Sequence, residues 1–214
     1  MSMIIETLVY SLDELSDEAK DRARAWYRDA DPADDWSEAV FTDFETLCDI
    51  LGLTLRTDPV PLMGGGVRRE PRIFFRGFWS QGDGALFEAT YSYRKHVVRR
   101  IREHAPEDRD LQAIADALFE VQRRNFYQLR AEVRRRGRGC DETALSVSVE
   151  RDSPTFQDAT DDAEDTVTEA LRDLARWLYG QLEREYAYLT SDPVVDETIL
   201  ANEYSFTETG CRFG

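Results

Sequence analysis

The spacing of apolar residues along the chain predicts a series of amphipathic helices. Residues three and four positions apart share a face of an α-helix, so an apolar stripe at this spacing marks a packed helix. After Ser16, which is a suitable cap, the first stripe consists of Ala19, Ala23, Trp26 and Tyr27. After Pro32, the second consists of Trp36, Val40, Phe44, Leu47, Cys48 and Leu51. Gly52 then ends the helix, because glycine readily adopts left-handed backbone angles.

The second half of the chain contains four more segments with helical periodicity. The spacing predicts a short helix over residues 97–104 and a long helix whose apolar face runs from Leu111 to Leu129. We expect the final turns of this long helix to contain the arginine-rich segment 134–138, where positive charge would complement the helix dipole. A last long helix begins at the acidic run 158–165, and a short acidic helix is expected near residues 193–201.

Alternating apolar and polar residues predict strands between these helices. The clearest are residues 72–80 and 85–93, which are rich in aromatic residues and flank the turn 81–84. The second of them has a period-two face formed by Phe87, Ala89, Tyr91 and Tyr93. Shorter strands are expected at residues 4–10, 53–56 and 144–150, with an extended segment at 204–207.

The predicted elements indicate an α+β fold, in which a small antiparallel sheet packs against several α-helices. We expect one domain over residues 1–214, a length sufficient for a core without disulfides or metals. Residues 58–71, which contain Gly64, Gly65 and Gly66, are expected to form a flexible loop.

Cysteine spacing and hydropathy limit the class of protein. Cys48, Cys140 and Cys211 form no Cys-x-x-Cys pair, so neither a disulfide framework nor a zinc knuckle is indicated. No apolar stretch approaches the roughly 20 residues that a membrane span requires, and the first ten residues lack a signal-peptide pattern. We therefore expect a cytoplasmic protein with no membrane partner.

Charge is large and unevenly distributed along the chain. The net charge is −16, with both ends acidic and residues 67–139 basic. The acidic helices either solubilise the protein and pair with its basic middle, or present carboxylates to a basic surface, such as the nucleic-acid channel of another protein. Direct nucleic-acid binding is disfavoured because affinity for phosphates comes mainly from lysine and arginine. The local basic cluster at residues 134–138 leaves direct nucleic-acid binding open. The cluster is either a contact surface or an internal counter-charge.

No group of residues forms a recognisable catalytic constellation, so we expect no enzyme, cofactor or metal ligand. His96 and His104 are eight residues apart, which on one helix is about 12 Å of rise. That distance is too long for a shared metal without another ligand between them. The chain has no nucleophile elbow, phosphate-binding loop or dinucleotide fingerprint.

The segment around Gln81-Gly82-Asp83-Gly84 has two interpretations. As a binding tip, it would present Trp79 and Gln81, with Asp83 as a hydrogen-bond acceptor. As a structural hairpin, it would be a tight turn whose aromatic residues fill the core, and its glycines would allow positive φ angles.

Four parts of the chain resemble a family of proteins carried by tailed phages and prophages. They are residues 15–20 with Trp26-Tyr27, residues 77–85 (Gly-Phe-Trp-Ser-Gln-Gly-Asp-Gly-Ala), residues 122–127, and residues 182–192 with 202–208. Some members of that family are labelled as related to antitoxins. The resemblance carries over no catalytic residue. It implies a phage setting, in which small acidic proteins inhibit host defence as anti-CRISPR or anti-restriction proteins, some of them as DNA mimics.

Charge and resemblance together give a leading hypothesis. The chain would be a phage-encoded, non-enzymatic inhibitor in the cytoplasm of the bacterial host, binding a nucleic-acid-handling defence complex through acidic surfaces. The expected partner-binding residues are Asp31, Asp34, Asp35, Glu38, Asp158, Asp161, Asp162, Glu164, Asp165, Trp79, Gln81 and Asp83. The alternatives are an antitoxin-like protein that occludes a toxin, and a nucleic-acid-processing enzyme with an unrecognised site. The sequence leaves the oligomeric state open, with a dimer possible through aromatic residues at the hairpin.

Overall fold

The computed structural model describes residues 7–29 and 36–214. The predicted α+β class is confirmed, since α-helices alternate with short antiparallel strands. Where the sequence indicated one domain, the chain divides into two compact units. Unit 1 comprises Met1–Glu38 together with Glu183–Gly214, and unit 2 comprises Ala39–Leu182.

Unit 1 is built on two helices that are distant in the sequence, α1 (Asp17–Asp29) and α6 (Asp192–Ala201). Before α1, the short 3-10 helix η1 (Leu12–Glu14) is closed by the Ser11 N–H, which donates to the Glu14 carboxylate at 2.8 Å. The buried core of the unit consists of Leu12, Leu15, Ala19, Ala23, Val195, Ile199 and Phe206. The apolar stripe predicted for the first helix therefore does face a core.

The C-terminal segment completes unit 1. Phe206 forms isolated antiparallel bridges with Tyr10 and with Arg212. Of the strand expected at residues 4–10, the first three residues lie outside the described part, and only Tyr10 makes a bridge. Arg24 donates two hydrogen bonds of 2.7 Å to Asp196, which tie α1 to α6 and hold the pKa of Asp196 below its ordinary value.

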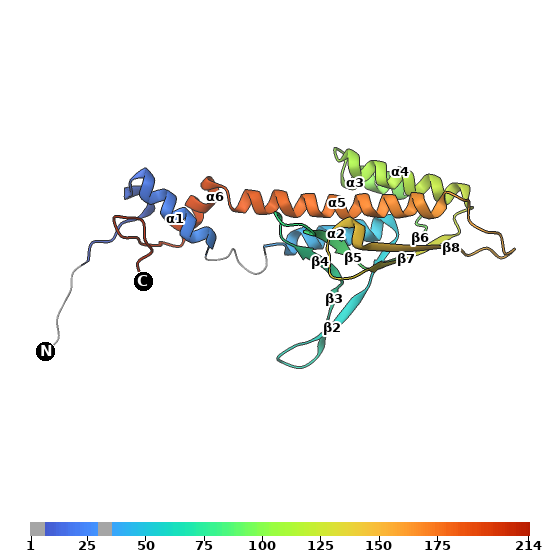
Figure 1. Ribbon diagram of the computed structural model, residues 1–214, viewed down its shortest axis with the longest axis horizontal. Coiled ribbons are helices and arrows are strands. Elements are labelled where there is room, and N and C mark those ends of the chain that lie inside the picture. The colour runs from blue at the N-terminus through green and yellow to red at the C-terminus, as the bar shows by residue number, and fades with distance from the viewer. Residues whose placement is uncertain (1–6, 30–35) are drawn as a thin grey trace. The chain divides into compact units, whose positions relative to one another are not determined.

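Unit 2 contains a four-stranded antiparallel sheet in the order β1-β6-β7-β8. Its strands are β1 (Leu53–Leu55), β6 (Ala89–Ser92), β7 (Leu129–Arg135) and β8 (Leu145–Arg151), with the 3-10 helix η2 (Glu142–Ala144) leading into β8. The helices α2 (Glu38–Leu51), α4 (Arg109–Arg124) and α5 (Ala163–Leu189) lie on one side of this sheet (Figure 1). The helix α3 (Val97–His104), whose bounds match the prediction, pairs with α4.

One predicted strand is divided between two sheets. Residues 85–93 form β5 (Gly84–Phe87) and β6, which are separated by Glu88. β5 pairs with β4 (Ile73–Arg76), whereas β6 belongs to the four-stranded sheet. The carboxylate of Glu88 accepts hydrogen bonds from Arg72 (2.8 Å) and from the Arg135 N–H (3.2 Å). Burial raises the pKa of Glu88, but these donors lower it by more, so the pKa lies below its ordinary value.

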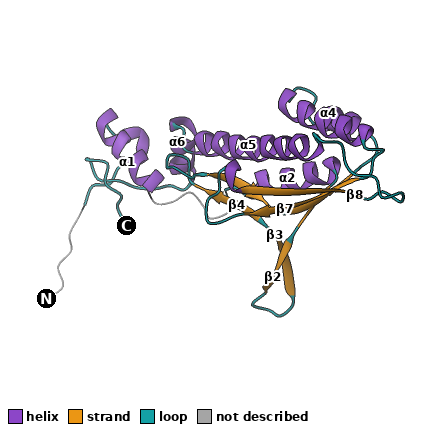
Figure 2. Ribbon diagram, turned by 45° about the vertical axis from the view of Figure 1, so that its right-hand side comes forward, coloured by secondary structure: helices purple, strands orange, loops and turns teal. Residues whose placement is uncertain are grey.

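The sequence predicts a loop at residues 58–71, but these residues form an antiparallel ribbon. β2 (Thr57–Pro61) pairs with β3 (Val67–Pro71), and the glycines 64–66 occupy its tip. The ribbon projects from unit 2 on the side of the sheet opposite the helices (Figure 2). Prolines and glycines favoured a loop prediction, but prolines are tolerated in a two-stranded ribbon because both of its strands are edges.

The position of the arginine-rich segment is a second correction. The helix α4 ends at Arg124, and the arginine-rich segment lies beyond it: Arg134 and Arg135 end strand β7, and residues 136–138 follow that strand. The buried side chain of Gln122 donates to the Leu129 carbonyl (2.8 Å) and accepts from the Leu129 N–H (3.1 Å), so it fixes the start of the strand. Leu129, Ala131 and Val133 then alternate with exposed residues, which is the period of a strand.

Candidate functional site

The predicted partner-binding residues do not gather on one surface. Asp31, Asp34 and Asp35 lie outside the described residues. Glu38 is exposed at the first position of α2 and belongs to unit 1. The other predicted residues lie in unit 2, in two separate places: the acidic run 158–165 and the hairpin tip 77–83.

The acidic run presents its carboxylates to solvent at the start of α5. Asp158, Asp161, Asp162, Glu164 and Asp165 are all exposed. Asp162 pairs with Arg124 at 2.7 Å, and hydrogen bonds from Arg124 and Thr160 hold the pKa of Asp162 below its ordinary value. Among the described residues, the other four carboxylates have no cationic group within 4.0 Å. Acids at a helix N-terminus are stabilised by the helix dipole, so the run also has a structural explanation.

The turn that follows α4 is bound directly to this acidic run. Asn125 Nδ2 donates to Thr160 Oγ1 (3.0 Å), and the Thr160 N–H donates back to Asn125 Oδ1 (2.9 Å). The Asp152 N–H also donates to the Gln128 carbonyl at 2.9 Å. Because these bonds join residues 125–128 to residues 152–160, the two segments form one surface. We call it the acidic-aromatic surface: Phe126, Tyr127, Phe156 and the acidic run 158–165.

The aromatic residues of this surface have an unusual backbone conformation. Phe126, Tyr127 and Phe156 have φ angles of 55°, 62° and 56°, in the left-handed region that bulky side chains rarely adopt. The Phe126 side chain is 69% exposed and that of Phe156 is 96% exposed. Strain of this kind costs of order 1–3 kcal/mol per residue and persists only where neighbouring structure enforces it. The fold therefore accepts strain where it presents aromatic rings to solvent.

Buried amide groups and one arginine hold this turn in place. Gln122 and Asn125 are fully buried, and Asn125 Nδ2 also donates to the Val121 carbonyl at 2.9 Å. Arg151 donates to Gln128 Oε1 (3.0 Å), Gln157 Oε1 (2.8 Å) and the Asp158 carbonyl (3.0 Å). Its guanidinium carbon also lies 5.2 Å from the centre of the Phe126 ring. The exposed rings are thus supported by a turn in which each polar group named here makes a hydrogen bond.

The hairpin tip combines the two interpretations that the sequence allowed. The Asp83 side chain is only 7% exposed, and its carboxylate accepts the N–H groups of Trp79 (2.9 Å) and Ser80 (2.6 Å). Asp83 therefore folds the turn from within. Trp79 is 80% exposed and Gln81 is exposed, so these two residues remain surface candidates. The rings of Trp79, Phe78 and Tyr179 follow one another at centroid distances of 5.7 Å.

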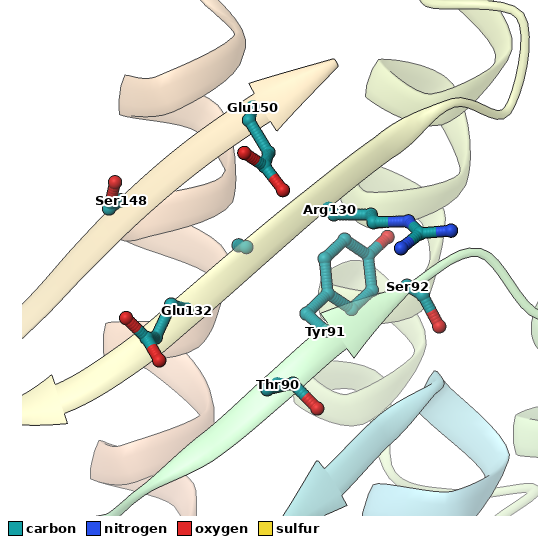
Figure 3. Close-up of a pocket in the computed structure, with 8 residues that line it drawn as sticks. Thr90, Tyr91, Ser92, Arg130, Glu132, Ser148 and Glu150 are labelled. Atoms are coloured by element: carbon teal, nitrogen blue, oxygen red, sulfur yellow. The ribbon is translucent and has the colours of Figure 1, made fainter. Parts of the chain in front are cut away.

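The outer face of the four-stranded sheet carries a shallow polar pocket of about 630 Å³ (Figure 3). Hydroxyl and charged groups line it, and they come from alternate positions of three strands: Thr90, Ser92, Arg130, Glu132, Ser148 and Glu150. Glu132 pairs with both Arg134 and Arg56, which hold its pKa below the ordinary value. Arg130 pairs with Asp152 at 2.8 Å. With these charges matched internally, the face has the chemistry of a solvated side of an antiparallel sheet.

Residues able to bind metals or act as nucleophiles are dispersed in unit 2. Within residues 7–29 and 36–214, no three His, Cys, Asp or Glu side chains are arranged to hold a metal ion. His104 Nε2 lies 3.0 Å from Asp43 Oδ1, while His96 is exposed before α3 with a φ of 64°. Burial raises the pKa of the Cys48 thiol well above its ordinary value, as expected for a core residue.

The sequence interpretation missed Phe126, Tyr127 and Phe156 as surface residues. Phe126 was assigned to the apolar stripe of a helix that in fact ends two residues earlier. Asn125, which is common at helix ends, was the available signal.

Comparison with known protein families gives a match over most of the chain. The sequence model of one family, described as a domain of unknown function (DUF8835), matches residues 36–192. This range contains all of unit 2 and excludes most of unit 1. No curated protein and no solved structure matches the chain. Among the described residues, no helix is both long and apolar enough to cross a membrane.

Proposed function

The chain belongs to the DUF8835 family, and we propose that it acts without catalysis, by binding a basic protein partner through the acidic-aromatic surface. In this proposal the partner belongs to a nucleic-acid-handling defence complex of a bacterial host. The chain would be its phage-encoded inhibitor in the host cytoplasm, with acidic residues taking the place of DNA phosphates. The phage setting rests on the family resemblance of residues 77–85 and 122–127, among others.

The observation that carries this proposal is the display of aromatic rings beside carboxylates that, Asp162 apart, have no ion pair within the described part of the chain. Protein interfaces are enriched in aromatic anchors surrounded by a polar rim. Phe126 and Phe156 have the exposure of such anchors, and the buried amides beneath Phe126 reduce the entropy that binding would cost. The net charge of −16 would draw a basic partner toward this rim and accelerate encounter.

The test is affinity capture from host lysate at low and moderate salt, with a charge-matched control. The test variant replaces Asp161, Glu164 and Asp165 with lysine. The control variant replaces Asp13, Asp17 and Glu18, which are also exposed acids near the start of a helix, in unit 1. Both variants change the net charge equally and remove similar helix-dipole interactions, so they should unfold at similar temperatures.

The test variant should recover at least about tenfold less of a nucleic-acid-handling complex than the control, because several charge pairs are reversed at once. Salt should weaken capture by the unmodified chain. Equal loss in both variants would show an effect of net charge alone and refute the assigned surface. Stoichiometric recovery of one small toxin would replace this proposal with the antitoxin hypothesis.

A further inference from the structure

A second concave feature of unit 2 lies between α3 and α4. It is a groove of about 710 Å³, and neither the sequence nor the proposed function assigns it a role. Three aromatic residues, Tyr93, Phe119 and Tyr127, contribute to its lining. Tyr127 also belongs to the acidic-aromatic surface, so the groove and that surface share a residue.

The aromatic side chains of the groove form a platform of two stacked rings, so a ligand can contact only the ring faces that point away from the stack. The rings of Tyr93 and Tyr127 are 4.5 Å apart between centroids and inclined by 38°. Phe119 lies 6.2 Å from Tyr127. Tyr127 is one of the residues with a positive φ, so the turn fixed by Gln122 and Asn125 also positions this platform. The π-face of a tyrosine attracts cations, and arginine stacks on it more often than lysine does.

Carboxylates line the same groove. Glu103, Asp116 and Glu120 pair with Arg99 (2.9 Å), Arg102 (3.3 Å) and Arg123 (2.6 Å), respectively. Each of these carboxylate side chains is about half exposed, and exposed pairs of this kind contribute little stability. They can therefore rearrange when another cation enters.

Elsewhere in unit 2, one carboxylate binds two guanidinium groups at once. Asp49 pairs with Arg94 (2.7 Å) and Arg100 (3.5 Å). Glu132 does the same with Arg56 and Arg134. The carboxylates of the groove can accept a second arginine in the same way, without losing the first.

We infer that this groove binds an arginine side chain from a peptide segment of the partner. The guanidinium stacks on the Tyr93–Tyr127 platform and donates to a lining carboxylate such as Glu120. Unit 2 already contains arginines beside aromatic rings: Arg135 lies 4.6 Å from the Phe74 ring and Arg151 lies 5.2 Å from the Phe126 ring, with their guanidinium groups donating to carbonyl and amide oxygens. Arginine is favoured over lysine because its planar guanidinium can stack and donate in a fixed fork. This inference rests on the proposed function, since it specifies the chemistry of the basic partner.

An anionic aromatic ligand fits the groove less well. A nucleotide could stack on the same rings, but its phosphate would meet three carboxylates and a chain with a net charge of −16. The charges of the groove itself are balanced in pairs, since Glu103, Asp116 and Glu120 bind Arg99, Arg102 and Arg123. The groove adjoins the acidic run through Tyr127, and Asp158, Asp161, Glu164 and Asp165 have no cationic group within 4.0 Å among the described residues, so a cationic occupant is favoured.

Defined probes test this inference without knowledge of the partner. Fluorescence anisotropy would compare labelled hexa-arginine, hexa-lysine and AMP on the full chain at low salt. We expect hexa-arginine to bind roughly tenfold tighter than hexa-lysine, since one stacking contact is worth about that factor, and AMP not to bind. Tyr127→Leu removes the π-face but retains an apolar side chain, so it should bring the two peptides to equal affinity. Tyr93→Leu serves as a second variant if Tyr127→Leu does not fold.

The matched control is Tyr188→Leu, which changes an exposed tyrosine outside both the groove lining and the acidic-aromatic surface. It should leave the preference for arginine intact. Equal affinity of both peptides for the unmodified chain, or AMP binding that Tyr127→Leu abolishes, would overturn the arginine site alone. If neither peptide binds, the proposed attraction for basic partners fails as well. Binding that falls with the lysine variant of Asp161, Glu164 and Asp165 but not with Tyr127→Leu supports the surface and rejects the groove.

Discussion

The turn at residues 125–128 and the hairpin tip at residues 77–83 both present aromatic rings to solvent, but they do so by different means. At the hairpin tip, glycines occupy the unusual conformations, with φ angles of 43° at Gly77 and 85° at Gly82. A buried carboxylate, Asp83, closes the turn. At the turn after α4, Phe126 and Tyr127 themselves adopt positive φ, and buried amides hold them there.

The difference lies in which residues adopt the unusual backbone conformation: those that form the turn, or those whose side chains the turn exposes to solvent. The glycines and Asp83 of the hairpin motif are explained by folding alone, and Trp79 is displayed without backbone strain of this kind. After α4, the displayed residues carry the strain, and a glycine would relieve it. Strain that has no folding benefit is the better indication of function. The comparison therefore favours Phe126 and Tyr127 over the hairpin motif as the centre of a binding surface.

The largest expected effect comes from breaking the hairpin through Gly84. A Cβ atom at this position would lie 2.4 Å from the Cys140 carbonyl oxygen and 2.8 Å from the Asp141 Cα. Because both are backbone atoms, Gly84→Ala should lower the free energy of unfolding by about 3 kcal/mol or more, as overpacking does. Urea denaturation measures this, and a loss below about 1 kcal/mol would contradict the close approach.

The next effect comes from breaking the turn after α4 through Asn125. Asn125→Ala leaves the Thr160 N–H and the Val121 carbonyl without their side-chain partner. We expect a loss of about 2–3 kcal/mol in the free energy of unfolding, because three hydrogen bonds of a buried side chain are removed. Asn202→Ala, which removes an exposed asparagine at the end of α6, is the control and should cost well under 1 kcal/mol. If the two variants unfold alike, the buried amide does not hold the turn.

The smallest expected effects sharpen the comparison. One variant places a residue with a Cβ atom at a positive φ in the hairpin, and the other places a glycine at a positive φ in the turn after α4. Gly82→Ala meets no atom closer than 3.9 Å, so its cost of about 1 kcal/mol comes from the positive φ alone. Phe126→Gly relieves the same strain but loses the contact with Arg151 and gains chain entropy when unfolded. Its free energy of unfolding should change by less than about 0.5 kcal/mol in either direction. Thermal denaturation of both variants would decide; a large loss from Phe126→Gly would mean that the ring is a packing residue.

The sequence predicted the helices well wherever one apolar stripe faced one core. The stripe of Phe44, Leu47 and Leu51 in α2 is buried as expected, and α3 has the predicted bounds. Prediction failed where a strand pattern, with a period of two residues, directly followed a helical pattern with a period of 3.6 residues. Val121 and Leu129 fit one helical face on paper, but the backbone between them turns, because Gln122 bonds to Leu129 instead of to solvent. A hydrogen bond between a side chain and a distant backbone group has no periodicity that a sequence could reveal.

The candidate site was predictable only in part, for a related reason. The acidic run is recognisable because like charges cluster in the sequence, and its acidic residues are exposed. Asp83 was proposed as an acceptor for a partner, yet it accepts two backbone N–H groups of its own turn. Apolar composition indicates burial, so Phe126 and Phe156 were not candidates. Their exposure depends on the bonds between Asn125 and Thr160, which are 35 residues apart.

The single residue between β5 and β6 has a consequence for how unit 2 opens. Glu88 joins a strand of one sheet to a strand of another and accepts bonds from residues next to β4 and within β7. Neither sheet can lose its strand at this point without pulling on the other. Local opening in native proteins usually proceeds through separable cooperative groups of residues. Here the amide hydrogens of Leu86 and Thr90 should exchange with solvent in one common event, so that the two sheets behave as a single cooperative body.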